Sequence, residues 1–394
     1  MSDLWLLPAG IEELMPADAL RLERLRRSLV DLCYSFGYDL VSPSLLEHLD
    51  SLLSGVGKDL ELETFKLIDH SSGRQLGIRA DMTPQIARID AHVLRSNRPS
   101  RLCYAGPVLR ARPQQAAELR EQFQLGAELY GSPEVSADAE IVDLMISCLA
   151  RCGLGPIHLD IGHVGVYRSL AELASLNKEQ EVKFFEALQR KSTPDLELLV
   201  GSLDLSPELS NSLVSLANMH GPVAELADIT AQLEMFGSSV SSSLENLRAV
   251  IEKVAKTCPS LDIHFDLSEL RGYHYHTGVV FSAFCEGFGK EVARGGRYDS
   301  IGAVYGHSRP ATGFSLDLRQ LLCLSVRNPI GDSVILAPPV GDDEALEHLV
   351  VALRDQGNRV VRKLHLGDDW DMEHVDKQLV LGNDGWIFKE LPSK

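Results

Sequence analysis

Arg271-Gly-Tyr-His-Tyr-His-Thr-Gly278 and the later run Arg294-Gly-Gly-Arg-Tyr-Asp299 decide how this sequence is interpreted. Polar and aromatic side chains alternate along the first stretch, which predicts a strand, and the paired glycines of the second predict a turn. Such a segment lines a pocket with polar groups while the glycines let backbone approach a ligand closely. The alternative is a solvated hairpin that carries histidines, and these residues alone do not separate the two.

Length and composition describe a globular protein. The chain has 394 residues, enough for two or three domains, and its apolar fraction of 44% is that of a protein with a core. The N-terminus lacks the basic and apolar regions of a signal peptide, and no apolar stretch reaches the length of about 18 residues that a membrane span needs. We therefore expect a soluble, cytoplasmic protein with no membrane partner. Its seven scattered cysteines include no Cys-x-x-Cys pair, so buried free thiols are expected.

The formal net charge of -18 bears on the choice of partner. Phosphate backbones are bound through Lys and Arg, and this electrostatic attraction dominates the affinity for nucleic acid. A chain this acidic binds nucleic acid only through a local basic patch. Nucleic acid is therefore a disfavoured partner, and the simplest explanation of the charge is a well-solvated surface.

Two long apolar runs predict the centre of the fold. Residues 101–112 and 122–130, joined by a polar loop, are typical of paired central strands. The surrounding order of helices and adjacent hairpins predicts an α+β fold, an antiparallel sheet flanked by helices, and not a doubly wound sheet. Locally, residues 43–53 are predicted to form a helix, and Thr83 is expected to cap a helix that begins at Pro84.

The pattern changes twice along the chain. Strand signals largely vanish between about 165 and 257, where apolar residues recur at helical intervals, so this range is predicted to be a helical insertion. We predict a main domain over 1–325, a linker over 326–332 and a small C-terminal α/β domain over 333–394.

Seven segments carry a resemblance to one family. They are Gly10–Pro16, Gly37-Tyr38 with Pro43 and Glu47, Arg79-Ala-Asp-Met-Thr-Pro84, Tyr104-Ala-Gly-Pro-Val-Leu-Arg110, Gln124-Leu-Gly-Ala-Glu128, Arg271–Gly278 and Gly295-Gly-Arg-Tyr-Asp299. These segments occur in the same order as in histidyl-tRNA synthetases, which the sequence resembles over nearly all of residues 1–325. The resemblance implies the class II aminoacyl-tRNA synthetase fold and a dimer formed through the region of Pro43.

The resemblance also implies a pocket for histidine. Its residues would be Asp81, Thr83, Arg110, Gln124, Glu128, Arg271, Tyr275 and Tyr298. Carboxylates suit the ammonium group, and buried acceptors with an aromatic wall suit the imidazole. Arg271 would face the ligand carboxylate. Asp81 stands where the synthetases have Glu, so its contact would be shorter by one methylene. Each residue alone is more simply a strand side chain, and only the set in register favours the pocket.

The sequence departs from the synthetases where they handle ATP. Ala111 and Arg112 follow Arg110, and the adenine-contacting glutamate of the synthetase pattern is missing. Asp317 occupies a glycine position near the nucleotide, and Gln320 occupies the position of the arginine that clamps the γ-phosphate. Loss of that cation removes charge stabilisation that phosphoryl chemistry depends on. Residues 330–394 contain 7 Lys and Arg against 13 Asp and Glu, a net charge of -6 that disfavours binding of tRNA.

A synthetase-like body that keeps the histidine pocket and loses the ATP residues is similar to the family of ATP phosphoribosyltransferase regulatory subunits, which His274-Tyr-His276 also resembles. The resemblance implies a non-catalytic subunit of the first step of histidine biosynthesis. It would assemble with the short catalytic subunit, activate it and mediate feedback inhibition by L-histidine, with no cofactor of its own.

Three alternatives stay open at this point. The chain could be an authentic histidyl-tRNA synthetase, or a stand-alone amino-acid sensor that binds some other partner. His274 and His276 could also lie on one strand face as metal ligands. Because the sequence offers no third ligand at a matching spacing, we predict no metal.

Overall fold

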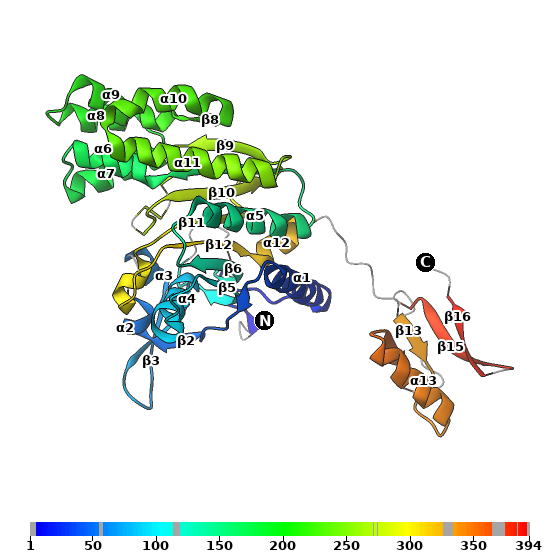
Figure 1. Cartoon of the computed structure of the whole chain (residues 1–394). Helices are drawn as coiled ribbons and strands as arrows, with labels where there is room; N and C mark the ends of the chain where they lie inside the picture. The colour runs from blue at the N-terminus through cyan, green and yellow to red at the C-terminus, as the bar shows by residue number, and fades with distance from the viewer. Residues whose placement is uncertain are drawn as a thin grey trace. The chain divides into compact units, whose positions relative to one another are not determined.

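The computed structural model describes residues 5–54, 58–112, 119–270, 272–273, 275–325, 334–364, 375–383 and 385–391. The chain divides into two compact units, residues 1–326 and 327–394, which Figure 1 shows coloured from blue at the N-terminus to red at the C-terminus. The predicted linker, 326–332, lies outside the described residues. The exact domain boundaries stay a prediction.

One large sheet organises the first unit. Its strand order is β1-β5-β6-β12-β11-β10-β7-β9-β8. The strands are β1 (Asp39–Leu40), β5 (Ser100–Leu109), β6 (Glu121–Tyr130), β7 (Ile157–His163), β8 (His220–Pro222), β9 (Asp262–Asp266), β10 (Val279–Cys285), β11 (Ala293–Arg297) and β12 (Ala311–Asp317). Neighbours pair antiparallel, except that β1 runs parallel to β5 and β7 parallel to β9. The predicted α+β fold is confirmed, with the two long apolar runs paired as β5 and β6.

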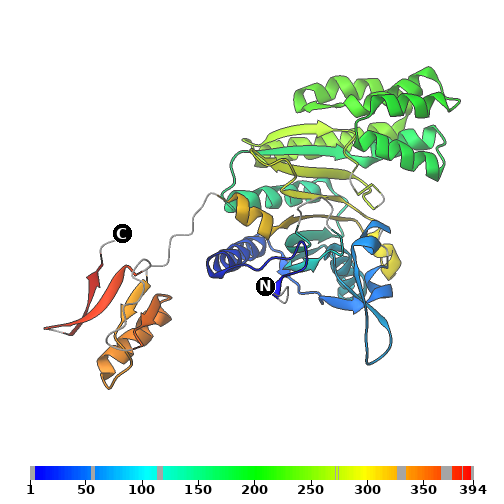
Figure 2. The same cartoon turned by 180° about the vertical axis from the view of Figure 1, so that it is seen from behind.

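Helices pack against one face of this sheet and bury the main core. They are α1 (Pro16–Ser35), α5 (Val135–Arg151), α11 (Ser238–Thr257) and α12 (Leu318–Leu324). Apolar residues at helical spacing in α5, such as Ile141, Leu144 and Cys148, are fully buried. They meet the alternate strand residues Leu125 and Ala127. Figure 2 shows α1, α5 and α12 together beside the sheet.

The opposite face carries a smaller apolar cluster around Met82, Ile86, Tyr104 and Tyr298. The elements near it are β2 (Leu46–His48), α2 (Leu49–Leu52), α3 (Lys58–Glu63), β3 (Phe65–Ile68), β4 (Gln75–Ile78), α4 (Thr83–Arg88), η2 (Ile89–Leu94) and η6 (Ile301–Tyr305). Strands β2, β4 and β3 form a separate sheet in that order. Because these elements cover the face incompletely, room is left there for a cavity.

The predicted helical insertion is helical almost throughout. Its elements up to the start of α11 are α6 (Val164–Leu173), α7 (Lys178–Gln189), α8 (Thr193–Gly201), α9 (Pro207–Ser215), η3 (Leu216–Asn218), η4 (Val223–Glu225), α10 (Leu226–Leu233) and η5 (Glu234–Phe236). Only the short strand β8 interrupts it, and β8 joins the edge of the large sheet. These helices gather at the β9 end of the sheet in Figure 1.

Three local predictions were wrong. Residues 43–53 form strand β2 and the short helix α2, because residues 46–48 pair with β4 and this tertiary pairing overrides the helical periodicity. The described part of 271–278 forms turns and not a strand. The glycine pair 295–296 lies inside β11 and not in a turn, since β11 is paired with β10 and with β12.

The second unit is a small α/β fold. Strands β13 (Val334–Ala337), β14 (Arg359–Arg362), β15 (Lys377–Gly382) and β16 (Gly385–Glu390) form a sheet in the order β14-β13-β15-β16. The helix α13 (Glu344–Asp355) buries Leu346, Val350 and Leu353 with Ile335 and Leu379.

Two expectations from composition can be compared with the structure. Among the described helices, none combines the length and apolar character of a membrane span. All seven cysteines are free, as predicted, but Cys323 is exposed and Cys258 partly exposed, so burial holds for five of them.

Candidate functional site

A cavity of about 1070 Å³ lies over the sheet face that the core helices leave open. Residues of β6, β10, β11 and β12 line it, together with residues of α4, α7 and the turn over 272–276. Since alternate strand residues share a face, Glu128, Gly313 and Gly296 form one row across three strands, joined by the pairs Glu128–Gly313 and Gly313–Gly296. This row places the carboxylate of Glu128 and the side-chain-free position Gly313 in the lining of the cavity, with Gly296 next to Gly313.

Glu128 is the most buried of the cavity's acidic residues. Its side chain is 1% exposed, and Tyr104 Oη donates a hydrogen bond of 3.0 Å to Oε1. Tyr298 Oη donates to Oε2. Burial raises the pKa of Glu128 to about 8, although the hydrogen bonds from Tyr298 and Tyr104 oppose this rise. The carboxyl is therefore poised between its neutral and charged forms near neutral pH.

A second acidic group stands at the start of α4. Asp81 Oδ1 accepts hydrogen bonds from Gln124 Nε2 at 2.8 Å and from the backbone N–H of Thr83 at 2.9 Å. Gln124 Oε1 in turn accepts from the backbone N–H of Met82 at 2.9 Å. The prediction that Thr83 caps the helix was wrong, because Thr83 is the first residue of α4 and its hydroxyl lies 3.2 Å from Tyr104 Oη.

Aromatic rings border the same space. Tyr275 is 45% exposed, and its ring centroid lies 4.5 Å from that of His276. His276 is buried, with Nδ1 3.1 Å from the carbonyl oxygen of Arg297, and burial lowers its pKa to about 4. Its imidazole is thus neutral at physiological pH, and its ring lies 6.1 Å from that of Tyr298. The cavity offers an aromatic wall next to its carboxylates.

Two guanidinium groups line the cavity as well. Arg110 Nε lies 3.5 Å from Glu63 Oε2, and Arg294 Nη1 lies 3.5 Å from Glu291 Oε1. Arg294 was not among the predicted site residues. It shares its strand face with Gly296, and this parity is the signal that identifies it. Anionic and cationic side chains therefore occur together, a combination that suits a zwitterion.

The structure brings most of the predicted site residues together. Asp81, Thr83, Arg110, Glu128, Tyr275 and Tyr298 line the one cavity, and Gln124 is hydrogen-bonded to Asp81 beside it. Arg271 and His274 lie outside the described residues. Helix α7 was not part of the predicted site, and it contributes Lys178, Glu181, Val182, Phe185 and Gln189 to the lining.

The positions that depart from the synthetase pattern have partners within the protein. Asp317 Oδ1 accepts hydrogen bonds of 3.0 Å from the backbone N–H groups of Phe123 and Arg319, so it caps α12. Gln320 Nε2 donates to the carbonyl oxygen of Glu291 at 2.9 Å. Arg319 points toward Glu121, whose Oε2 lies 3.2 Å from its Nη1, and it does not line the cavity.

The antiparallel sheet, its helical layer and the carboxylate-lined cavity define a protein of the class II aminoacyl-tRNA synthetase type. A family model described as histidyl-tRNA synthetase matches residues 10–321. The crystal structure of a histidyl-tRNA synthetase from Nostoc sp. PCC 7120 matches with a TM-score of 0.78 at 19% identity, covering 98% of this chain and 94% of that one.

Sequence relatives identify the family within this class of protein. A family model described as the C-terminal domain of ATP phosphoribosyltransferase subunit HisZ matches residues 332–389. An ATP phosphoribosyltransferase regulatory subunit from Stutzerimonas stutzeri is 46% identical over 393 residues, 99% of each chain, and one from Pseudomonas syringae pv. tomato is 47% identical over 394 residues. The chain belongs to the family of ATP phosphoribosyltransferase regulatory subunits, and its role is regulatory, in histidine biosynthesis.

One solved structure carries both descriptions. It is the crystal structure of an ATP phosphoribosyltransferase regulatory subunit/histidyl-tRNA synthetase from Bacillus halodurans, with a TM-score of 0.82 and 28% identity. The match covers 94% of this chain and 96% of that one, so the likeness includes most of both chains.

Proposed function

We propose that this chain binds L-histidine in the cavity and passes that signal to a short catalytic subunit of ATP phosphoribosyltransferase. The observation that carries the proposal is the buried carboxyl of Glu128, held by Tyr104 and Tyr298 at the base of the cavity. A carboxyl buried in this way ionises readily only when a partner of opposite sign is present, and the ammonium group of an amino acid is such a partner.

The remaining groups complement the rest of a histidine molecule. Asp81, held in place by the hydrogen bond from Gln124, offers an acceptor for the ammonium or a ring nitrogen, and Tyr275 offers an aromatic surface for the imidazole. Arg110 supplies a cation for the ligand carboxylate, beside the predicted contact from Arg271. Feedback inhibition follows if histidine binds the inhibited state of the assembly more tightly than the active one.

We infer further that the chain does not catalyse adenylation by itself. Asp317 is turned inward as a helix cap, and Gln320 bonds a backbone carbonyl. Neither position supplies a cation for the phosphates of ATP, which phosphoryl chemistry requires.

Assembly is the second part of the proposal. Exposed apolar side chains occur around Pro43, namely Leu40 at 53%, Leu45 at 46% and Leu46 at 41% exposure. An apolar surface of this kind supports self-association through the region where the resemblance implies a dimer.

Mixed with the short catalytic subunit, the full chain is expected to form a hetero-oligomer whose phosphoribosyl transfer differs in rate and is inhibited by histidine. Alone, it is expected to show neither phosphoribosyl transfer nor histidine-dependent pyrophosphate exchange. Size-exclusion chromatography with light scattering and a coupled activity assay measure both. Failure to associate would exclude the regulatory mechanism, whereas pyrophosphate exchange by the chain alone, or aminoacylation of tRNA, would support a synthetase. Histidine binding without association would indicate a stand-alone sensor.

Substituting Gly313→Ala is expected to abolish measurable histidine binding. A Cβ at this position would lie 1.5 Å from Glu128 Oε2 and 2.8 Å from the carbonyl oxygen of Ala127, so the carboxyl must leave its place. Titration calorimetry with histidine measures the effect. Gly155→Ala is the matched control, because a Cβ there meets nothing within 4 Å. Wild-type affinity in the folded Gly313→Ala variant would place histidine elsewhere.

A further inference from the structure

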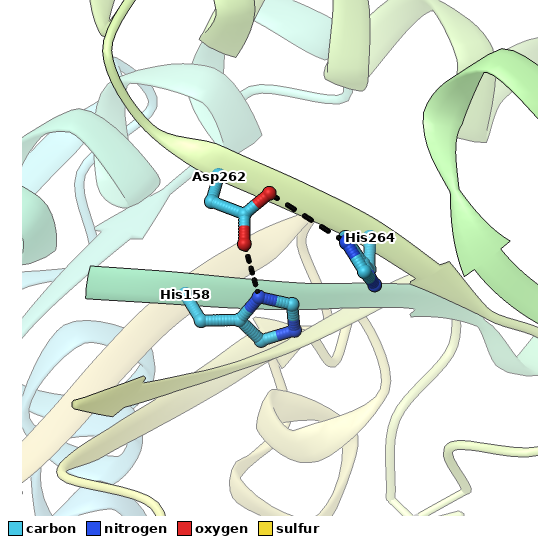
Figure 3. A group of neighbouring side chains, drawn as sticks. All are labelled: His158, Asp262 and His264. Atoms are coloured by element: carbon cyan, nitrogen blue, oxygen red, sulfur yellow. Dashed lines mark hydrogen bonds and ion pairs between the residues drawn. The ribbon is translucent and has the colours of Figure 1, made fainter. Parts of the chain in front are cut away.

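A cluster of imidazoles and carboxylates lies on β7 and β9, outside the cavity. The two strands run parallel, with His158 paired to Asp262 and Asp160 paired to His264. Alternate residues of a strand share a face, so all four side chains project from the same side of the sheet. Figure 3 shows His158, Asp262 and His264 pointing toward one another.

The distances within the cluster are short. His158 Nδ1 lies 2.8 Å from Asp262 Oδ2, and His264 Nε2 lies 3.6 Å from Asp262 Oδ1. The two imidazole centroids are 4.4 Å apart. One ligand atom from each of the three residues falls within 4.8 Å of the others. A tetrahedral zinc ion with bonds near 2.05 Å needs ligand atoms about 3.4 Å apart, so small side-chain rotations suffice.

Asp160 adds the feature that distinguishes this cluster from a surface ion pair. Its Oδ1 lies 2.8 Å from His158 Nε2, the ring nitrogen that faces away from Asp262. Metal-bound histidines usually donate their second ring N–H to a carboxylate, which fixes the tautomer and orients the ring. If His158 donates its Nε2–H to Asp160, its Nδ1 carries no hydrogen and can bind a metal.

From this geometry we infer that His158, Asp262 and His264 form a site for a divalent transition metal such as Zn²⁺, with Asp160 as the carboxylate that orients His158. Two imidazoles and a carboxylate suit zinc or a neighbouring transition ion, whereas Mg²⁺ and Ca²⁺ prefer oxygen ligands alone. The next acidic residue on β9, Asp266, is not a ligand, because Lys191 Nζ lies 2.8 Å from its Oδ2.

The position of the site gives it a structural consequence. Strand β9 ends at Asp266, and the turn over 272–276 that lines the cavity follows it along the chain after residues 267–271. Asp160 is paired across the sheet with Ser282, and Ser282 with Arg294, and both of these residues line the cavity. A metal joining β7 to β9 would therefore hold together the two strands that lie between the cavity strands and the edge strand β8.

The test is a Zn²⁺ titration of the full chain after chelator treatment, in competition with a chromogenic chelator. We expect one site per chain and at least tenfold weaker binding for His264→Ala and Asp262→Asn. Asp160→Asn should lose roughly 10- to 100-fold, as when a hydrogen-bond partner of a metal ligand is removed. The exposed His70→Ala serves as matched control and should bind as the wild type does. All variants carry Cys323→Ser, which removes the exposed thiol as a competing ligand.

Cobalt substitution provides a readout that does not depend on affinity. Co²⁺ bound by nitrogen and oxygen ligands in a four-coordinate site gives visible absorption bands that should disappear in His158→Ala, provided circular dichroism shows the variant folded. Should the wild type bind no Zn²⁺ in competition, or should the His264 and Asp262 variants bind as the wild type does, the cluster is an ordinary ion pair and the inference is overturned.

Discussion

Replacing Glu128 by Gln is expected to weaken histidine binding about 10- to 150-fold, which corresponds to loss of one charged hydrogen bond of about 1.5–3 kcal/mol. Gln keeps the volume of Glu and resembles its protonated form, so the contacts with Tyr104 and Tyr298 have a polar partner in the variant as well. What the variant lacks is the negative charge that the proposed function pairs with the ammonium group of histidine. Titration calorimetry and the histidine sensitivity of the assembled complex measure the loss.

The raised pKa of Glu128 sets the direction of the pH dependence. With a pKa of about 8, against an ordinary value of 4.5, the carboxyl of the empty cavity is largely protonated at pH 7. Binding of an ammonium group requires the carboxylate, so histidine binding releases a proton and tightens as pH rises toward 8. Calorimetry in two buffers of different ionisation enthalpy detects this proton, and Glu128→Gln should abolish its release.

The same pKa affects stability with a definite sign. Between pH 4.5 and about 8 the folded chain holds a proton on Glu128 that the unfolded chain has released. This contribution to stability is complete below pH 4.5 and is lost as pH rises toward 8. Glu286→Gln, an exposed substitution, is the matched control for both measurements. If Glu128→Gln binds histidine with wild-type affinity, the carboxylate is not the ammonium partner.

Replacing Asp138 by Ala is expected to destabilise the first unit by about 3–5 kcal/mol, because it leaves a buried guanidinium without its partner. Asp138 is 0% exposed, and its Oδ2 lies 2.9 Å from Arg297 Nη2. The pair links α5 to β11, and Tyr298, which lines the cavity, directly follows β11. Differential scanning calorimetry should show a Tm lowered by several degrees.

Matched variants distinguish the loss of the buried ion pair from the general effect of removing a charge from a helix. Asp138→Asn keeps the shape and part of the hydrogen bonding with Arg297 and should cost less than Asp138→Ala. Glu179→Ala removes an exposed ion pair with Lys183 on α7 and should leave the Tm unchanged within error. Equal Tm values for wild type and Asp138→Ala would show that the Arg297 guanidinium finds another partner.

Most of the sheet was predictable because its strands are long and apolar. The runs that became β5 and β6 needed no tertiary information, and motif order gave the class of fold. The helix predicted over residues 43–53 was wrong because strand β2, within this range, forms only by pairing with β4. The glycine pair 295–296 was predicted to form a turn. A strand that contains glycines is stabilised by the strands it pairs with and not by its own residues, so the local sequence does not indicate a strand.

Most residues of the site could be predicted from the sequence, but the full lining of the cavity could not. Glu128 and Gln124 alternate on one strand, so their shared face follows from the sequence. The contribution of α7 does not, since no local pattern tells which helix of a helical segment returns to the sheet. His158 and His264 are likewise distant in sequence, and only the parallel register of β7 with β9 brings them together.

The row formed by Glu128, Gly313 and Gly296 has a consequence for how this protein tolerates genetic change. Every missense codon at Gly313 adds a Cβ, and that atom overlaps Glu128 whichever amino acid is encoded. Under the proposed function, any single replacement there would abolish histidine sensing, whereas altered ligand preference would need changes at other residues that line the cavity. Spontaneous feedback-resistant alleles should accumulate at such glycines more readily than alleles with altered ligand preference.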